Sequence, residues 1–472
     1  MNTTERLASL DMTWLQLDRE TNRLHVTGVL VFDTRLRRDR LEDILRRRLL
    51  RLDRFGQHVI RDTVGAIWES GRVDLDYHVQ TFALPDAADP RHALQALVGR
   101  LASTPLDPGR PLWQLHLVEK YRHGSAVVVR VHQCIADSIA LIGVVQSLTD
   151  DHPTTPEDAI PPAGQFDTSF FEHLYAPLTQ AMIEGIKLSG AAWAKYWSLL
   201  FYPQQVFDYA RTNAALTMEI GKLMGMRDDS RTCLKGTPQG TKLASWSAPL
   251  AASSVQAAAR THRATNDATL LACLAGALRR FFVRQGDGAE GVELRALVPV
   301  NLRGEKARDP LGNRGGILPL ALPVGIDDPV TRLAEIQRRL EDFEDAYRAH
   351  DTLGLFNLIG QTPRAVQAQA LRLVSAKASA LLCHVPAASE ARYVDGARIS
   401  EQMFWSPVTG DMGLSMSILS YAGHYQVGLM VDASMVPDPE TITGQLGEEL
   451  RLLRNAPASS RKPRSRKAAS TS

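Results

Sequence analysis

Apolar residues alternate with polar ones, or recur at helical spacing, through the first 150 residues of the chain. Residues 25–33, HVTGVLVFD, are rich in β-branched side chains and predict a strand, whereas leucines at helical spacing in 41–55 predict an amphipathic helix. Residues 111–121 and 125–133 predict neighbouring strands joined by the turn YRHGS. The remaining predicted elements are extended segments at 66–70 and 75–85 and helices at 92–104 and 137–151. We therefore expect an α/β domain that ends near residue 150.

A second α/β block begins near residue 242. Residues 266–282, NDATLLACLAGALRRFF, predict a strongly apolar helix, with Asn266 or Asp267 placed to cap its start. Residues 414–432 predict two strands across a Tyr-Ala-Gly turn. The other predicted elements are strands at 293–303 and 315–325 and a charged helix at 328–350.

The segment between these blocks differs in composition from both. Residues 152–165 are rich in proline and predict a linker. Residues 168–228 predict helices, which either pack on the core as a crossover or present an aromatic surface to lipid. The aromatic side chains concerned are Trp193, Tyr196, Trp197, Phe201 and Tyr202. The predicted division is an N-terminal domain at 1–150, a linker and helical crossover at 151–235, a C-terminal domain at 236–456 and a tail at 457–472. The tail is polar and basic, which predicts disorder, with weak adhesion to anionic membrane as the alternative.

Composition and charge narrow the class of protein. The chain has 472 residues, of which 44% are apolar and 22% charged, as in ordinary soluble globular proteins. A net charge of +2 gives no electrostatic reason to expect nucleic acid as a partner. The 4 cysteines form no CxxC pair, which argues against a zinc site or a disulfide scaffold. The start, MNTTERLASLD, lacks the apolar core of a signal peptide, and no uncharged apolar run reaches about 20 residues. We expect a cytoplasmic protein that meets lipid, if at all, peripherally, on the inner membrane or on lipid inclusions.

The stretch VVVRVHQCIADSIALIG, residues 127–143, carries the candidate chemistry. A β-branched run ends in His132, and Asp137 follows five residues later, just before a predicted helix. Such a junction of strand and loop is typical of an acyltransfer site. An alcohol is a poor nucleophile at neutral pH, and imidazole, with a pKa of about 6.5, suits the removal of its proton.

Short motifs spread over nearly the whole chain resemble those of the bacterial wax ester synthase/acyl-CoA:diacylglycerol acyltransferase family, in the chloramphenicol-acetyltransferase-like superfamily. The motifs are LDMTWLQLD, VDLDYHV, STPLDPGRPLWQL, ATNDATLLACLAGALRRF, LVPVNLR with LGNRGG, SAKASALLCHVP and YQVGLMVDASMVPDPE. The resemblance implies an α/β (α+β) fold of two such domains with a tunnel between them. It also implies transfer of a fatty acyl group from acyl-CoA, as co-substrate and without a cofactor, to a long-chain alcohol or diacylglycerol.

The family signature His-His-x-x-x-Asp-Gly is altered in this chain. The resemblance implies that its second histidine is the general base and that its aspartate keeps the loop in shape. Here the signature reads His132-Gln133-Cys134-Ile135-Ala136-Asp137-Ser138, so Gln133 takes the place of the base and Ser138 that of the glycine. A glutamine amide donates and accepts hydrogen bonds but has no useful basicity.

The other residues of the signature leave alternatives open. Neighbours in a strand point to opposite faces, so His132 either packs away from the tunnel and orders the loop or, through a kink, replaces the base. Cys134 is either a small core residue or a nucleophile assisted by His132. Asp137 is expected to support the geometry of the loop. Ser138 fits most positions that glycine occupies, except those with positive φ.

Further residues match or depart from the family pattern. Asn266 and Asp267 match its Asn-Asp motif, and we expect them to order the far wall of the tunnel. Asn313 and Arg314 either approach a phosphate of CoA or form a turn. His384, at a position where the family usually has asparagine, is a displaced base or a solvated or core histidine. Pro111, Leu112 and Trp113 match its Pro-Leu-Trp motif, where packing is the simplest role.

Two functions follow from these patterns. The first is an acyl-CoA-dependent O-acyltransferase that tolerates Gln133 and works with His132, with water or through positioning alone. The second is a non-catalytic homologue that binds acyl chains or a protein partner. The preserved motifs around the signature favour the enzyme. Chain length, acceptor and oligomeric state leave no mark in the sequence.

Overall fold

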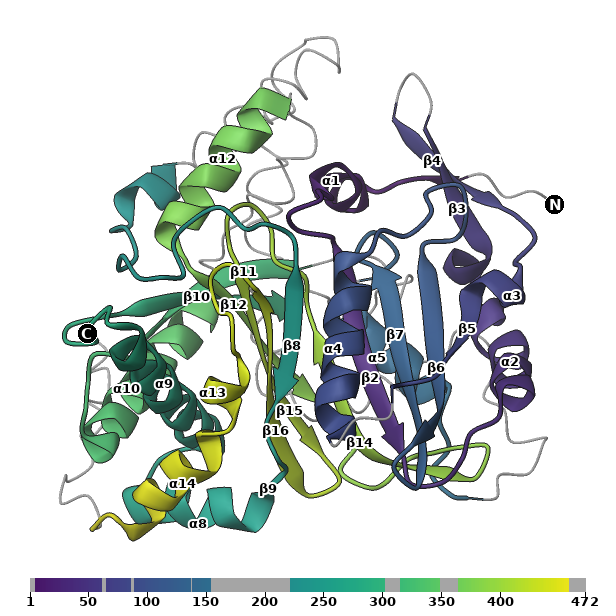
Figure 1. Cartoon of the computed structure of the whole chain (residues 1–472). Helices are drawn as coiled ribbons and strands as arrows, with labels where there is room; N and C mark the ends of the chain where they lie inside the picture. Colours follow the sequence, from purple (N-terminus) through teal and green to yellow (C-terminus); the bar gives the residue numbers. More distant parts are fainter. Residues whose placement is uncertain are drawn as a thin grey trace, which may run out of the picture.

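The computed structural model contains two large β-sheets, each covered by helices (Figure 1). It describes residues 5–61, 65–85, 89–136, 138–153, 221–301, 315–348 and 364–457. The predicted linker after residue 153, the aromatic helical segment up to residue 220, and all but the first residue of the tail lie outside the described residues. Within the described part, none of the helices has both the length and the apolarity needed to span a bilayer.

The first sheet has six strands in the order β13-β14-β2-β7-β6-β5. Its strands are β2 (His25–Phe32), β5 (Val79–Phe82), β6 (Trp113–Tyr121), β7 (Gly124–His132), β13 (Tyr393–Val394) and β14 (Ala397–Trp405). The predicted hairpin of residues 111–133 is confirmed as β6 and β7, which pair antiparallel. Strand β14 comes from the second half of the chain and pairs antiparallel with β2. The second half of the chain thus contributes strands to the sheet that the first half forms.

Helices cover both faces of this first sheet. They are α1 (Ser9–Leu17), α2 (Arg38–Arg47), α3 (Leu75–His78), α4 (Pro90–Ser103) and α5 (Ser138–Ser147). Two 3-10 turns, Leu49–Arg51 and Asp53–Gly56, follow α2, where we predicted one helix at 41–55. A separate small sheet holds β1 (Glu5–Arg6), β3 (Gln57–Arg61) and β4 (Ala66–Ser70). The predicted extended segment 75–85 was wrong in its first four residues, which form α3 because Asp74 caps a helical turn there through the backbone N–H of Asp76.

The second sheet has the order β11-β10-β12-β15-β16-β8, with β9 also paired to β16. Its strands are β8 (Lys242–Trp246), β9 (Leu250–Ala251), β10 (Leu294–Asn301), β11 (Gly315–Leu322), β12 (Ala380–Pro386), β15 (Leu414–Tyr421) and β16 (His424–Asp432). Its helices are α8 (Ala252–His262), α9 (Asn266–Gln285), α10 (Pro329–Arg348), α12 (Arg364–Lys377), α13 (Glu440–Thr443) and α14 (Leu446–Asn455). The strands predicted at 293–303, 315–325 and 414–432 and the helices at 266–282 and 328–350 are confirmed.

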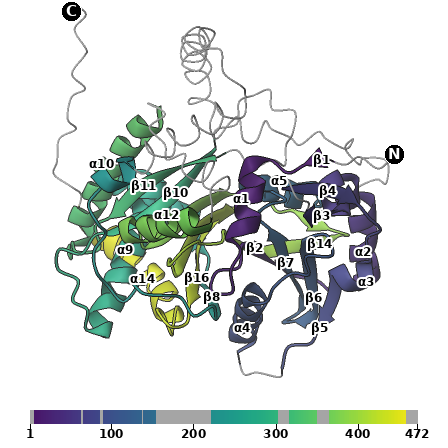
Figure 2. The same cartoon turned by 90° about the horizontal axis from the view of Figure 1, so that it is seen from above.

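The two sheets meet along one side of each. Helix α4 packs against β8, and β14 packs against β15 and β16, so the lobes share a continuous contact (Figures 1 and 2). Asn22 crosses this contact, because its Nδ2 donates to the carbonyl oxygens of Gly410 at 2.7 Å and Met412 at 3.1 Å. Helices α9, α10 and α14 cover the opposite face of the second sheet (Figure 1).

Candidate active site

The signature begins where β7 ends, between β2 and β6. The backbone N–H of His132 donates to Leu112 O at 2.9 Å, and that of Gln133 donates to Leu24 O at 2.8 Å. The N–H of Ile135 then donates back to His132 O at 3.0 Å, which closes a turn. These bonds fix the backbone of the signature to both neighbouring strands. Leu112, from the Pro-Leu-Trp motif, therefore supports the signature directly.

His132 lies in the interior as a neutral imidazole. Its side chain is 2% exposed, and burial lowers its pKa to about 3. Its Nδ1 accepts the backbone N–H of Cys134 at 3.1 Å, which leaves the ring proton on Nε2. His132 thus orders the turn that follows it, and Nε2 has no hydrogen-bond partner among the described residues.

The structure describes the remaining signature residues only in part. Gln133 is half-buried within the turn, and Ser138 is the first residue of α5. Burial raises the pKa of the Cys134 thiol well above 9, so the thiolate needed by a nucleophile is disfavoured there. Asp137, and the Asn313 and Arg314 predicted to approach CoA, lie outside the described residues.

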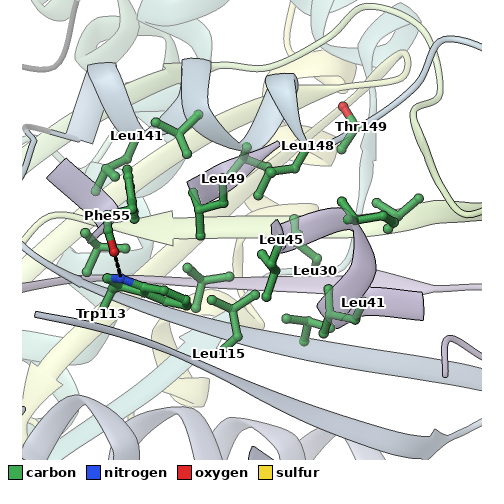
Figure 3. A pocket seen from close by; sticks show the side chains of 18 of the residues that line it. Leu30, Leu41, Leu45, Leu49, Phe55, Trp113, Leu115, Leu141, Leu148 and Thr149 are labelled. Atoms are coloured by element: carbon green, nitrogen blue, oxygen red, sulfur yellow. Dashed lines mark hydrogen bonds between the residues drawn. The ribbon is translucent and has the colours of Figure 1, made fainter. Parts of the chain in front are cut away.

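One face of the first sheet lines an apolar cavity (Figure 3). The cavity has a volume of about 50 Å³, and its walls are the sheet, α2 with the turns after it, and α5. Val131, next to His132, belongs to its lining. Trp113 closes one end, where its Nε1 donates to Phe55 O at 2.8 Å (Figure 3). The labelled side chains converge on this space: Leu30, Leu41, Leu45, Leu49, Phe55, Trp113, Leu115, Leu141, Leu148 and Thr149.

The opposite face of the same sheet turns toward the second lobe. Because side chains alternate along strands, His25 and Thr27 of β2 share this face with Arg130 and His132 of β7. Arg130 Nη1 donates to the carbonyl oxygens of Leu101 and Thr104 at 2.7 Å each, at the C-terminal end of α4. A buried cation at that end is favoured by the helix dipole. Arg130 therefore joins α4 to β7 two residues before His132.

A second cavity, with a volume of about 30 Å³, lies between the lobes. Its wall from the first lobe includes His25 and Thr27, and its wall from the second includes Lys242 and Ser415. Lys242 Nζ donates to Asn22 Oδ1 at 2.7 Å and pairs with Asp432 at 3.3 Å. The remaining lining residues are Asn22, Arg23, Ala102, Trp405, Ser406, Pro407, Val408, Gly413 and Met430.

His25 of this cavity is a further candidate for the chemistry, and the sequence patterns did not indicate it. It is 4% exposed, and both of its ring nitrogens are buried with no hydrogen-bond partner among the described residues. A buried polar group without a partner costs about 1–3 kcal/mol. Burial is the main cause that lowers the pKa of His25 well below 6.5, with His132, Arg130 and Arg23 contributing. The only signal available in the sequence was alternation, which puts His25 on the same strand face as Thr27.

The Asn-Asp motif lies elsewhere. The helix cap predicted at Asn266 or Asp267 was wrong: Thr265 is the N-cap, and its side chain accepts the N–H of Ala268 at 3.1 Å. Asn266 and Asp267 are already inside the first turn of α9, so their side chains are free to bind across to the sheet. Asn266 Nδ2 donates to Tyr425 Oη at 3.3 Å, and Asp267 lies 3.6 Å from His384.

His384 lies on the face of the second sheet that packs against α9. Its β12 neighbours in alternation, Ala380 and Leu382, belong to the core under α9, whereas Leu381 and Cys383 belong to the core shared with the first lobe. His384, with its partner Asp267, is therefore on the far side of this sheet from the cavity between the lobes. The structure does not bring these residues together with His132 and Gln133.

Family models match both halves of the chain. A family model described as the wax ester synthase/diacylglycerol acyltransferase catalytic domain matches residues 7–200, and the WS/DGAT C-terminal domain matches residues 311–454. The chain is 26% identical over 477 residues to a putative diacylglycerol O-acyltransferase of Mycobacterium tuberculosis, with 96% of each chain covered. A probable diacylglycerol O-acyltransferase of the same organism is 25% identical over 393 residues, which cover 81% of this chain and 82% of that one.

Solved structures confirm the predicted fold class. The wax ester synthase/diacylglycerol acyltransferase from Marinobacter aquaeolei VT8 is similar with a TM-score of 0.64 at 18% identity, over 95% of this chain and 98% of that one. The first condensation domain of the calcium-dependent antibiotic synthetase is similar with a TM-score of 0.60 at 16% identity, over 97% of each chain. The chain therefore has the α/β (α+β) fold of two chloramphenicol-acetyltransferase-like domains.

Proposed function

Since the chain belongs to the wax ester synthase/diacylglycerol acyltransferase family, we propose that it transfers a fatty acyl group from acyl-CoA to the hydroxyl of a long-chain alcohol or of diacylglycerol. The observation that carries this proposal is the apolar cavity behind β7, whose lining reaches Val131, next to the signature. Family membership supports the acyltransfer, and the cavity supports a fatty acyl chain as the group transferred. Acyl-CoA is the co-substrate, and no cofactor takes part.

The cavity suits a fatty acyl chain in its chemistry. Its volume of about 50 Å³ is below the 300–1,000 Å³ of typical ligand sites, so a chain that enters it must displace side chains of the lining. Its lining side chains are apolar apart from Thr149, so a hydrocarbon chain leaves no polar group there without a partner. Each methylene that moves from water into such a site contributes about 0.8 kcal/mol. An acyl chain held in the cavity would have its carboxyl end near the end of β7.

Gly28 helps to shape this cavity. It pairs with Phe404 of β14, and a Cβ on Gly28 would lie 2.3 Å from an atom of the Phe404 ring. Only glycine therefore lets that ring lie flat on β2. Because Phe404 also lines the cavity, the second half of the chain contributes to the proposed acyl site.

The lipid substrates imply contact with a membrane or a lipid inclusion. Long-chain alcohols and diacylglycerols partition into lipid, so we propose that the protein works in the cytoplasm and meets these surfaces peripherally. The described cysteines are free thiols, which suits a reducing compartment.

The first prediction concerns turnover itself. Purified protein given palmitoyl-CoA with hexadecanol or diacylglycerol is expected to release free CoA and form the matching ester in equal amounts. The measurement is thiol release with a thiol reagent, together with mass spectrometry of the lipid product. A reaction without an acceptor controls for hydrolysis of the thioester.

The altered signature gives a second candidate function, a non-catalytic homologue that binds acyl chains, because Gln133 cannot accept a proton. Binding of labelled palmitoyl-CoA without any ester product would favour that function. It would be favoured further if a Gln133→His variant made ester and the natural protein did not.

The second prediction tests the acyl site by narrowing it. Val145 of α5 is half-buried and lines the cavity, so Val145→Phe would put extra volume into the path of the chain. Misfit in an apolar pocket costs about 1–3 kcal/mol per methylene. We expect the ratio of kcat/KM for palmitoyl-CoA to that for octanoyl-CoA to fall by about tenfold or more.

The matched control is Val283→Phe, the same change on α9 at a side chain that is 56% exposed. This variant is expected to keep the natural ratio. A ratio unchanged in Val145→Phe as well would place the acyl chain outside this cavity.

A further inference from the structure

His25 lies one strand away from the altered position of the signature. It is the first residue of β2 and pairs in register with His132, with ring centroids 5.9 Å apart. The residue before it, Leu24, accepts the backbone N–H of Gln133 at 2.8 Å. Neighbouring strands are about 4.8 Å apart, so the backbone of position 133, at the end of β7, lies beside the start of β2, where His25 is the first residue.

His25 borders the cavity between the lobes. It lines that cavity together with groups from both lobes, Thr27 and Ala102 from the first and Lys242 and Ser415 from the second. The structure describes no hydrogen-bond partner for either of its ring nitrogens. Buried polar groups in native proteins almost always have a partner, so a ring left in this state next to a cavity indicates a ligand that supplies one.

No other described residue of this lining offers a neutral nitrogen base. A guanidinium such as that of Arg23 has no acceptor nitrogen, and Lys242 Nζ already donates to Asn22 and pairs with Asp432. His132 is on the same sheet face, but it is absent from the lining, and its Nδ1 is already bound to the Cys134 N–H. These observations separate the two histidines into a structural one, His132, and one that borders the cavity and has no described hydrogen-bond partner, His25.

We propose that His25 is the catalytic base of this protein and takes the role that Gln133 cannot fill. The proposal rests on the acyltransferase function proposed above. The hydroxyl proton of the acceptor moves to a ring nitrogen of His25 as the hydroxyl oxygen bonds to the thioester carbonyl carbon. The C–S bond then breaks, and the CoA thiolate leaves with the proton that His25 gives back.

The charges around His25 suit this cycle. Arg23 and Arg130 are cations that act on its ring, and Lys242 lines the same cavity. Burial, and after it His132, Arg130 and Arg23, lower the pKa of His25 and keep it neutral before the reaction. The same neighbours make the imidazolium a ready proton donor to the departing thiolate. The surroundings of His25 thus favour a base that is neutral at the start and at the end of each turnover.

The test compares His25→Gln, Gln133→His and the double variant with the natural protein. His25→Gln is expected to lower kcat with palmitoyl-CoA and hexadecanol by about 10²–10⁴-fold while KM stays within a few-fold, because a positioned base contributes that factor. Gln133→His is expected to restore much of the lost kcat in the His25→Gln background, since it returns an imidazole to the family position.

The matched control is His116→Gln, at a histidine that is 1% exposed in the same sheet but absent from the cavity lining. We expect its kcat to stay within a few-fold of the natural value. A second variant, His25→Ala, removes the ring and leaves space for a small molecule, so added imidazole is expected to raise its activity. Melting temperature and palmitoyl-CoA binding confirm that each variant is folded.

Labelling of the natural protein needs no variant. Diethyl pyrocarbonate is expected to inactivate it in step with modification of the peptide that contains His25, and bound substrates are expected to slow both. Inactivation that leaves His25 unmodified would overturn the proposal, as would a folded His25→Gln variant with natural kcat. Absence of ester from the natural protein would instead overturn the proposed function, and this inference with it.

Discussion

Replacing Glu449 by glutamine is expected to lower the free energy of unfolding by about 3–5 kcal/mol. Glu449 of α14 is 3% exposed and Arg332 of α10 is 2% exposed, and Arg332 Nη2 donates to Glu449 Oε2 at 2.5 Å. Arg280 of α9 donates to the other carboxylate oxygen at 2.6 Å. The substitution leaves the Arg332 charge buried without its counter-charge, and that loss is far larger than the loss of an exposed pair.

The remaining bonds of Arg332 prevent it from moving out to solvent. Its Nε donates to Ala272 O, and its Nη1 donates to the carbonyl oxygens of Ile326 and Asp327, each at 3.0 Å. Gly276 of α9 leaves the space for this cluster, because a Cβ there would lie 2.0 Å from Glu449 Oε2. The guanidinium is therefore held in place whether or not the carboxylate is present.

Denaturant unfolding of Glu449→Gln measures the effect, and the neighbouring residue supplies the control. Glu448 pairs with Arg451 at 2.8 Å or less, but these side chains are 38% and 59% exposed, so Glu448→Gln should cost less than about 1 kcal/mol. A double variant, Glu449→Leu with Arg332→Met, is expected to recover much of the loss, since an apolar pair removes both buried charges. Equal losses in Glu448→Gln and Glu449→Gln would contradict the role of burial.

Mild acid is expected to destabilise the protein strongly, because the first sheet holds histidines that are neutral when folded. Burial lowers the pKa of His116 and His132 to about 3, against about 6.5 in an unfolded chain. The unfolded state therefore binds protons below pH 6.5 that the folded state does not. Stability is complete above pH 6.5 and falls as the pH falls toward 3, by about 1.4 kcal/mol per pH unit for each histidine.

These two histidines together account for a loss of about 4 kcal/mol at pH 5, and His25 adds to it in the same direction. Denaturant unfolding at pH 7, 6 and 5 measures the slope. His116→Gln should lower the slope of unfolding free energy against pH by the share of one proton, about 1.4 kcal/mol per pH unit. The glutamine accepts the Arg130 hydrogen bond without titrating. His92→Gln, at a side chain that is 70% exposed, should leave the slope unchanged. A slope that His116→Gln does not alter would assign the acid sensitivity to other groups.

Local patterns in the sequence predicted most elements of the fold. The β6–β7 hairpin and α9 follow from alternation and from a long apolar helix, because nearby residues determine both. The cap of α9 was assigned to the wrong residue, since Thr265, Asn266 and Asp267 are all good caps and only the backbone geometry selects Thr265. The first turn of 75–85 is helical for a similar local reason, the cap at Asp74.

The candidate site was only partly predictable. The signature itself, with Gln133 in place of a base, is visible as seven consecutive residues. His25 is not, because its importance depends on pairing with His132 across strands and on Lys242 and Ser415 from the other lobe. Residues more than a hundred positions apart meet there, and no spacing in the sequence records that contact.

The insertion of β14 into the first sheet affects how the chain reaches its native state. Without β14, strand β2 would become a sheet edge with open N–H and C=O groups along its length, a template for pairing between molecules. A fragment that stops before residue 397 would carry that edge, and a nascent chain exposes it until synthesis is nearly complete. Pairing between residues about 370 positions apart also closes a very long loop, which makes folding slow. The two lobes are thus a single unit of expression and folding, and their aggregation risk is highest before β14 has been synthesised.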